Sequence, residues 1–241
     1  MAVELYLDLF SQPARSVYIF AKINNIKFDF KKITLFAGDQ YGEEFGRVNV
    51  MRKVPALRDG DFCLGESIAI MTYLSEKFRT PDHWYPADIQ KRARVNEYLS
   101  WQHTAVRMHG SRVFWLRLMI PKMLGEEVPK DRMAAALEDL DVSLQLIEEK
   151  FLQDRPFIAG DDISLADLVA IVEIMQPLGS GLDVFETRPV LSGWRDRVRA
   201  AIGPELFDEA HQVILGAQEM ANSMDTSALL PFKPKILRLF L

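Results

Sequence analysis

The N-terminal part of the chain alternates between strand-like and helix-like patterns of apolar residues. From Val3 to Leu9 every second position is apolar, which predicts a strand with one buried face. Ser11-Gln12-Pro13 then predicts a helix start, because serine caps helices and proline is tolerated in a first helical turn. A second strand is expected from Phe28 to Leu35, whereas residues 36–50, which contain three glycines, are expected to be irregular or weakly helical.

A hairpin and a helix are predicted next. Asp59-Gly60 lies between the apolar runs Val54 to Leu57 and Phe62 to Leu64, and Asp and Gly tolerate the positive φ required at the centre of a tight turn. Beyond Glu66, apolar residues recur at spacings of three and four, which marks one face of a helix. Ser67 is therefore expected at a helix N-terminus, where unpaired backbone N–H groups attract a carboxylate.

The chain becomes helical after a linker. Residues 79–87 contain two prolines and break the preceding pattern. Downstream, Ser164 is followed three residues later by Asp167, which is typical of a capped helix start. Helices are expected over residues 88–120, ending against Pro121, and over residues 137–151, 164–176, 190–201 and 205–220.

The order of these elements indicates an α/β domain followed by an all-helical domain. The first consists of a strand, a helix, a strand, an uncertain helix, two strands and a helix. We expect this domain over residues 1–78, a linker over residues 79–87 and the helical domain over residues 88–241.

Charge and composition exclude several functional classes. The net charge is −5 and no dense block of Lys and Arg precedes the C-terminal tail, so nucleic-acid binding is not indicated. No apolar run has the length of a membrane span, and Glu4 and Asp8 interrupt the first ten residues, so a cytosolic location without stable membrane insertion is expected. The single cysteine, Cys63, excludes an intrachain disulfide and is expected to be an inert buried thiol. The four histidines have no ligand spacing, so no metal site is expected.

Several short motifs occur together in an order that resembles theta-class cytosolic glutathione transferases. They are Leu5-Tyr6-Leu7-Asp8-Leu9 with Ser11-Gln12-Pro13, Lys53-Val54-Pro55-Ala56-Leu57, Glu66-Ser67, Trp101-Gln102-His103-Thr104 and Ile163-Ser164-Leu165-Ala166-Asp167. Each motif is weak alone, but their order and spacing are highly specific. The resemblance implies a thioredoxin-like N-terminal domain of order βαβαββα with a cis Val54-Pro55 bond, and a homodimer. It also implies glutathione as a co-substrate, no metal or dissociable redox cofactor, and a site for a small hydrophobic electrophile in the helical domain.

The resemblance also assigns roles to individual residues. The Ser11 hydroxyl would donate a hydrogen bond to the glutathione sulfur, although from the sequence alone Ser11 is as well explained as a helix cap. Arg107 would assist the thiolate or bind the leaving anion, and its alternative interpretation is an ordinary surface arginine. Glutathione would contact Gln12, Gln40, Lys53, Val54, Glu66 and Ser67.

Within the glutathione site, the two ends of the peptide are expected to meet different groups. Glu66 and Ser67 would bind the γ-glutamyl end, and Lys53, helped by Gln40, would bind the glycyl carboxylate. Gln40 departs from the histidine of theta members, so its amide would donate without charge.

The predicted function is glutathione transfer to small electrophiles such as alkyl halides, epoxides and sulfate esters, with reduction of organic hydroperoxides as a second implied activity. The alternative is a non-catalytic module of the same fold that binds partners through its helical domain. The tail around Pro231 to Arg238 is interpreted either as a frayed end or, by resemblance, as a lid over the active site.

Overall fold

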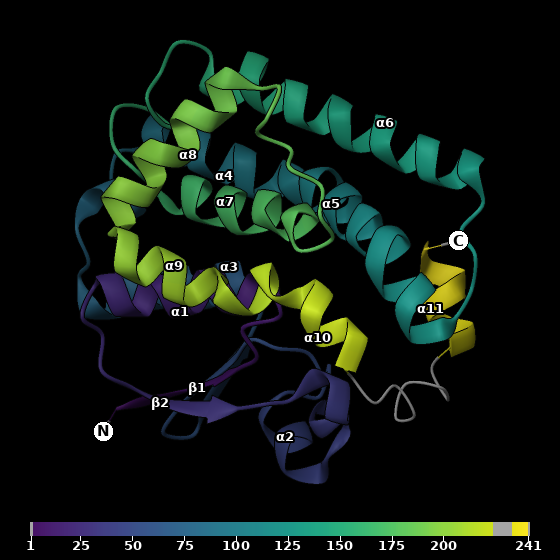
Figure 1. Cartoon of the computed structure of the whole chain (residues 1–241). Helices are drawn as coiled ribbons and strands as arrows, with labels where there is room; N and C mark the ends of the chain where they lie inside the picture. The colour runs from purple at the N-terminus through teal and green to yellow at the C-terminus, as the bar shows by residue number, and fades with distance from the viewer. Residues whose placement is uncertain (1, 224–232, 241) are drawn as a thin grey trace.

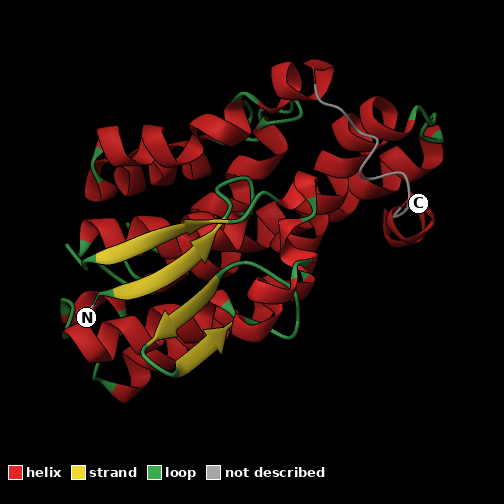
Figure 2. Cartoon of the chain, turned by 90° about the horizontal axis from the view of Figure 1, so that it is seen from below, coloured by secondary structure: helices red, strands yellow, loops and turns green. Residues whose placement is uncertain are grey.

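Four strands form one mixed sheet with the order β2-β1-β3-β4 (Figure 2). The computed structural model describes residues 2–223 and 233–240. β1 and β2 are parallel, whereas β3 is antiparallel to both β1 and β4. The elements of this domain are β1 (Val3–Leu7), α1 (Gln12–Ile23), β2 (Phe28–Lys32), α2 (Glu43–Val48), β3 (Ala56–Asp59), β4 (Phe62–Gly65) and α3 (Ser67–Phe78). Their order confirms the predicted thioredoxin-like βαβαββα arrangement.

The second strand is shorter than predicted. β2 ends at Lys32 instead of Leu35, and the chain continues through two 3-10 turns, η1 (Leu35–Ala37) and η2 (Asp39–Tyr41). The Asp8 carboxylate accepts a hydrogen bond from the Leu35 N–H (2.9 Å), which removes that donor from a sheet ladder and fixes the first turn.

The hairpin turn differs by one residue from the prediction. Asp59 pairs with Phe62 in the β3–β4 ladder, so the turn consists of Gly60-Asp61 instead of Asp59-Gly60. Of these two residues only Gly60 has a positive φ, at +62°.

The single cysteine is exposed, so its predicted burial is wrong. Cys63 lies on β4, which has only β3 as a neighbour in the sheet. Phe62 and Cys63 are both exposed because β4 is an edge strand of the described sheet, although the Phe62 ring still contacts Tyr73 of α3, with centroids 5.2 Å apart. An apolar run in the sequence does not distinguish an edge strand from a central one.

Helices make up the rest of the described chain (Figure 1). Within residues 2–223 and 233–240, none is both long and apolar enough to cross a lipid bilayer. The helical elements after α3 are η3 (Asp82–Trp84), α4 (Ile89–Trp101), η4 (Gln102–Thr104), α5 (Val106–Phe114), η5 (Trp115–Leu124), α6 (Lys130–Leu146), η6 (Ile147–Leu152), α7 (Leu165–Leu178), α8 (Pro189–Ile202), α9 (Pro204–Leu215), α10 (Ala217–Ser223) and α11 (Lys233–Phe240).

Several of the predicted helix limits are wrong. The helix expected from residue 137 begins at Lys130, and the one expected over residues 205–220 is divided at Gly216 into α9 and α10. The single helix expected over residues 88–120 is interrupted at Ala105, whose φ and ψ of −121° and −109° are not helical. It also continues past Pro121 to Leu124, because η5 has the wider turns of a π-helix and takes the proline into its interior. Helix α7 similarly includes Pro177, which was expected to end it.

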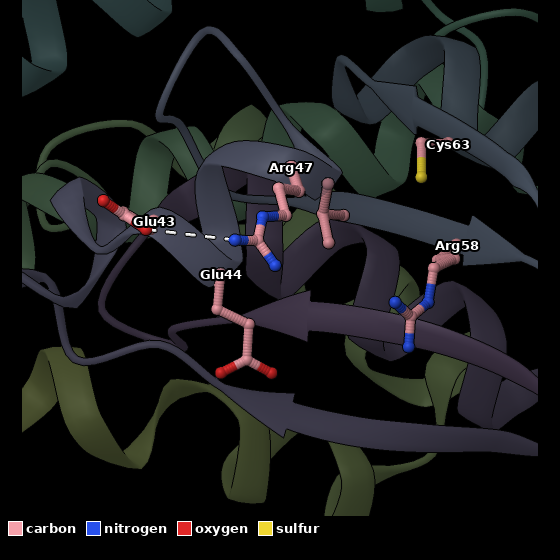
Figure 3. Close-up of a pocket in the computed structure, with 6 residues that line it drawn as sticks. Glu43, Glu44, Arg47, Arg58 and Cys63 are labelled. Carbon is pink, nitrogen blue, oxygen red and sulfur yellow. Dashed lines mark ion pairs between the residues drawn. The ribbon is translucent and has the colours of Figure 1, made fainter.

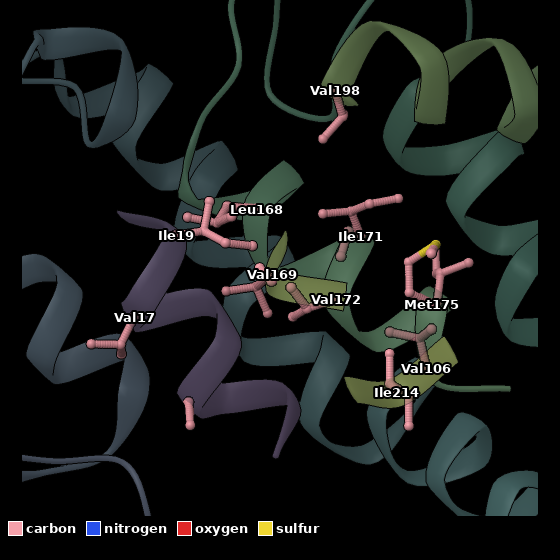
Figure 4. Packing of buried hydrophobic residues seen from close by; sticks show 14 of the residues in the cluster. Val17, Ile19, Val106, Leu168, Val169, Ile171, Val172, Met175, Val198 and Ile214 are labelled. Carbon is pink, nitrogen blue, oxygen red and sulfur yellow. The ribbon is translucent and has the colours of Figure 1, made fainter. Parts of the chain in front are cut away.

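Helix α7 lies at the centre of the core. Every residue from Leu165 to Pro177 is buried. Ser164 and Asp167 form the predicted capping box at its start. One side of α7 packs against α1 of the N-terminal domain, and others pack against α5, α8 and α9 (Figure 4). Since each large aliphatic side chain removed from water contributes about 1.5–3 kcal/mol, α7 is a major source of the cohesion between the domains.

The C-terminal helix α11 packs beside η5 (Figure 1). The Phe240 ring stacks on Trp115 with centroids 4.9 Å apart, and Lys233 Nζ is 2.7 Å from the Glu126 carboxylate. Pro231, which belongs to the segment interpreted as a lid, lies outside the described residues, as does the chain from 224 to 232.

The buried histidine on α9 should make stability depend on pH. His211 donates from Nδ1 to the Phe207 carbonyl (2.8 Å), and burial lowers its pKa from 6.5 to about 3. Below pH 6.5 the unfolded chain therefore binds a proton that the native state does not. The free energy of unfolding should fall by up to about 1.4 kcal/mol per pH unit from pH 6.5 toward pH 3. Urea unfolding at pH 7.5, 6.0 and 5.0 should give a smaller fall for His211→Gln than for the wild type, and parallel dependences would contradict the assignment.

Candidate functional site

A pocket of about 190 Å³ lies where the two domains meet. It brings together five of the predicted site residues, and its walls come from both domains. Most lining residues belong to the N-terminal domain, whereas two come from the start of the helical domain. The lining residues are Pro13, Asn49, Met51, Lys53, Val54, Pro55, Glu66, Ser67, His103 and Arg107.

The segment before β3 supplies one side of the pocket. Asn49 is buried, and its side chain donates from Nδ2 to the Lys53 carbonyl (2.8 Å) and accepts from the Met51 N–H (3.1 Å). These two bonds fix the loop that carries Lys53 and Val54. The Val54-Pro55 bond is cis, as the resemblance implies, and the chain then enters β3. Val54 therefore stands at a strand end on the pocket wall.

The start of α3 supplies a second side. Ser67 is the first residue of this helix and is only 7% exposed, so the unpaired N–H groups of the first helical turn lie at the pocket. Glu66 precedes the helix with a φ of +66°, a left-handed conformation that costs a non-glycine residue about 1–3 kcal/mol. Such strain occurs at sites where a side chain must point in a particular direction, and Glu66 lines the same pocket.

The helical domain closes the pocket with His103 and Arg107. These residues are four positions apart, although η4 and α5 are separate elements. Burial lowers the pKa of His103 below 6.5, the positive charge of Arg107 lowers it further, and the Glu66 carboxylate acts in the opposite direction. His103 therefore presents a neutral imidazole at pH 7.

Ser11 occupies the N-cap position of α1, two residues before the pocket-lining Pro13. Its side chain makes no capping hydrogen bond, so the hydroxyl does not have the role of a simple helix cap. The preceding backbone is held by Arg15, whose Nη1 donates to the carbonyls of Leu9 (2.8 Å) and Phe10 (3.1 Å). The loop that presents Ser11 is thus fixed by the guanidinium of the following helical turn.

The same guanidinium also binds the helical domain. Arg15 is fully buried, and its Nη2 donates to the Val172 carbonyl (3.2 Å) and to Gln176 Oε1 (2.7 Å) on α7. Burial lowers the pKa of Arg15 to about 10, with Glu173 and Asp8 opposing the shift, so the side chain remains charged at neutral pH. Arg15 therefore ties the Ser11 loop to α7.

Arg107 is not an ordinary surface arginine. Its side chain is 34% exposed, and its Nη1 donates to Glu173 Oε1 (3.1 Å), whose side chain is 1% exposed. Burial raises the pKa of Glu173, and the positive charges of Arg107 and Arg15 act against that rise. One part of Arg107 is thus paired inside the protein while another faces the pocket.

Comparison with known proteins identifies the family. The model of the glutathione S-transferase N-terminal domain matches residues 1–76, and that of the C-terminal domain matches residues 106–201. The chain is 55% identical to human glutathione S-transferase theta-1 over 219 residues, which cover 91% of each protein. This chain belongs to the theta class of glutathione S-transferases.

Solved structures agree with the theta-class assignment. The apo form of a human glutathione S-transferase superposes with a TM-score of 0.93 at 51% identity, with both chains covered completely. Human glutathione transferase theta-2, solved in complex with glutathione and an unknown ligand, superposes with a TM-score of 0.93 at 45% identity, covering 99% of this chain and all of that one.

Three predicted site residues of this theta-class chain do not line the pocket: Ser11, Gln12 and Gln40. The Gln12 side chain instead donates from Nε2 to Ser111 Oγ of the helical domain (2.8 Å). Gln40 lies on η2, and its Oε1 is buried with no hydrogen-bond partner among the described residues.

Five pocket residues were not predicted to contact the ligand: Pro13, Asn49, Met51, Pro55 and His103. Pro13, Pro55 and His103 belong to the motifs that carry the theta-class resemblance, and His103 lies four residues before Arg107, which is a signal that could have found it. Asn49 lies in the segment 36–50 that was expected to be irregular and Met51 follows directly after it, so no periodic pattern marks these two residues as facing a site.

A larger pocket of about 550 Å³ lies beside the sheet and α2 (Figure 3). It contains none of the predicted residues of the theta-class site, and both of its arginines are paired: Arg58 with Glu4, and Arg47 with Glu43 at 3.9 Å. We therefore place the site in the smaller pocket. Among the described residues, no group of three or more His, Cys, Asp or Glu side chains is arranged to hold a metal ion.

Replacing Arg15 with lysine should destabilise this theta-class chain, although both side chains carry a positive charge. Arg15→Lys keeps the charge but loses the planar fork that reaches the acceptors on both sides of the domain boundary. We expect a loss on the order of 3 kcal/mol in the free energy of unfolding, measured by urea titration.

A matched control for this substitution is Arg197→Lys. Arg197 is exposed and also donates to a backbone carbonyl, that of Pro156 (3.0 Å). Its replacement should change stability by less than about 0.5 kcal/mol. Equal effects of the two substitutions would show that the buried network around Arg15 contributes no more than a surface hydrogen bond.

Proposed function

We propose that this theta-class chain transfers glutathione to small hydrophobic electrophiles such as alkyl halides, epoxides and sulfate esters. The proposal is carried by one observation: Lys53, Val54, Glu66 and Ser67 meet Arg107 of the helical domain in a single pocket. An amino-acid-like ligand with charged ends fits such a pocket, and the cation from the second domain adds positive charge where a thiolate would lie.

The charged groups of the pocket suit the ends of glutathione. The Ser67 hydroxyl and N–H would bind the γ-glutamyl carboxylate at the N-terminus of α3, and the Glu66 carboxylate would pair with the γ-glutamyl ammonium. Lys53 would face the glycyl carboxylate, and Gln40, which lies on η2 outside the pocket lining, would add a neutral donor. The main chain of Val54 would pair with the central residue as an added strand does.

Ser11 would activate the glutathione thiol. A free thiol has a pKa of about 8.5, and holding it as thiolate near neutral pH requires roughly 2–3 kcal/mol. A hydrogen bond from a hydroxyl to a charged sulfur supplies about 1.5–3 kcal/mol, and the N-terminus of α1 about 0.3–1 kcal/mol. The absence of a capping bond from the Ser11 side chain supports this role, since the hydroxyl is not used by the helix.

The reaction is a substitution at the electrophile. The thiol proton leaves to solvent, and the thiolate sulfur attacks the electrophilic carbon to form a C–S bond. The bond from that carbon to the halide, epoxide oxygen or sulfate breaks, and its electron pair goes to that group. A halide or sulfate departs as an anion, whereas the oxygen of an opened epoxide stays on the product and takes a proton from solvent. Arg107 would stabilise the thiolate and the departing anion, while the pocket brings the two reactants together.

The chain is also proposed to be a cytosolic homodimer. Homodimers are implied by the theta-class resemblance, and large apolar side chains of the N-terminal half are strongly exposed, with Val50 at 85% and Ile89 at 80%. Such side chains are typical of surfaces that a second subunit covers.

Removing the Ser11 hydroxyl should lower turnover without preventing glutathione binding. In Ser11→Ala, kcat/KM for thioether formation with an epoxide or an alkyl halide should fall about 10- to 100-fold, the factor that corresponds to about 1.5–3 kcal/mol. The dissociation constant for glutathione, measured by calorimetry, should change little because the contacts to both ends of the peptide remain.

Ser16→Ala is the matched control on the same helix. The Ser16 hydroxyl donates to the Gln12 carbonyl within α1 (3.2 Å), so its loss should leave kcat/KM within about twofold of the wild type. Wild-type turnover equal to the buffer blank with halides, epoxides, sulfate esters and hydroperoxides would instead support the non-catalytic binding module.

One chain has a mass of 27.6 kDa, and light scattering should give twice that mass for the proposed dimer. Val50→Asp should weaken association about tenfold or more, because a charge would replace an apolar side chain at the interface. Val190→Asp, a control at an exposed valine on α8, should leave the mass unchanged. A wild-type mass of one chain at all concentrations would reject the dimer.

A further inference from the structure

Glu173 is a buried carboxylate for which the proposed reaction has no direct use. It lies on α7, 1% exposed, within a segment whose other side chains are almost all apolar. A carboxylate removed from water is destabilising unless charges or hydrogen bonds compensate it. Such a group requires a partner, and the structure provides two arginines.

The first partner is Arg107, at the pocket wall. Its Nη1 donates to Glu173 Oε1 at 3.1 Å, while the side chain remains 34% exposed and lines the pocket. An arginine side chain has many rotamers, so an unpaired Arg107 would distribute its charge over many positions. The ion pair restricts it to those in which the guanidinium faces the pocket.

The second partner is Arg15, which acts on Glu173 through its charge. Arg15 is fully buried and donates to the Val172 carbonyl and to Gln176 on the same helix. Burial raises the pKa of Glu173, and the positive charges of Arg107 and Arg15 oppose that rise. Of the two carboxylate oxygens, Oε1 accepts from Arg107, whereas Oε2 has no hydrogen-bond partner among the described residues.

We propose that Glu173 is a positioning residue that holds the Arg107 guanidinium toward the reacting sulfur from a place that no substrate reaches. This rests on the proposed function, since it concerns how that site keeps its cation in place. If Glu173 acts on the reaction through Arg107 and not through Arg15, its effect on turnover should vanish when Arg107 is absent.

A double-mutant cycle tests this dependence. Glu173→Gln, which keeps the shape of the side chain and removes its charge, should lower kcat/KM about tenfold in the wild type but less than about twofold in Arg107→Ala. Glu173→Asp, which keeps the charge but shortens the side chain by one methylene group, should behave in the same way. If Glu173→Gln does not fold, Glu173→Asp takes its place in the cycle.

A second measurement excludes a merely structural effect. The acidic limb of the kcat/KM profile reports ionisation of the glutathione thiol, and in Glu173→Gln it should move to higher pH by about one unit, matching the tenfold loss. If Glu173→Gln only removed a negative charge and left Arg107 in place, the pKa of the thiol would fall and the acidic limb would move to lower pH. A shift to lower pH, or no shift, would overturn the proposal.

Asp167→Asn is the matched control on the same helix. Asp167 is also fully buried, and it accepts hydrogen bonds from the Ile158 N–H (2.8 Å) and Trp194 Nε1 (2.9 Å), away from the pocket. This variant should lose stability, and any change in kcat/KM should be the same with and without Arg107.

The outcomes separate the two proposals. If turnover depends on Ser11 but Glu173→Gln has equal effects with and without Arg107, the positioning role is rejected and the proposed function stands. If the wild type shows no turnover, the proposed function fails and the positioning role fails with it.

Discussion

The burial of one guanidinium between two domains is the constraint on which the site depends. Arg15 is removed from water, and a buried charge is costly unless hydrogen bonds compensate it. Both of its terminal nitrogens donate to acceptors, whereas Nε has no partner among the described residues. Its acceptors lie on both sides of the boundary: the carbonyls of Leu9 and Phe10 before the serine loop, and Val172 and Gln176 on α7. The loop cannot shift relative to α7 without leaving some of these groups unpaired.

Helix α7 is the element that this constraint shapes most clearly. Its sequence is apolar apart from Asp167, Glu173 and Gln176, and each of these side chains has a specific partner. Asp167 completes the cap and binds Trp194, Glu173 pairs with Arg107, and Gln176 accepts from Arg15. The three polar residues thus attach a mostly apolar helix to defined neighbours, although Glu173 Oε2 has no hydrogen-bond partner among the described residues.

Local signals made much of this fold predictable. The alternation in β1, the apolar spacing of α3 and the Ser164–Asp167 box each depend on residues close in sequence. The structure confirms all three elements, although β1 ends at Leu7 instead of Leu9 and also buries Tyr6 of the opposite face. The theta-class motifs additionally led to most of the pocket, including the residues from Lys53 to Ser67.

What the sequence did not predict depends on distant contacts. Nothing near Arg107 in the sequence indicates that its partner is Glu173 on another helix. The apolar run of β4 likewise does not show that Cys63 lies on a sheet edge. The hydrogen bond of Gln12 to Ser111 likewise crosses the domain boundary, and the expected contact of Gln12 with glutathione stays a prediction. Each of these outcomes is decided by tertiary packing, for which a single sequence carries no periodic signal.

The burial of α1 bears on whether the two domains are separable. All residues from Pro13 to Ala21 are buried, because the helix is covered by α3 on one side and by α7 and α9 on the other. A thioredoxin-like unit cut off after α3 would expose the second of these faces, together with a charged Arg15 that had lost its acceptors on α7. The N-terminal half is therefore not an autonomous module that could be exchanged between proteins, and its recombination with a foreign helical domain would require a matching α7.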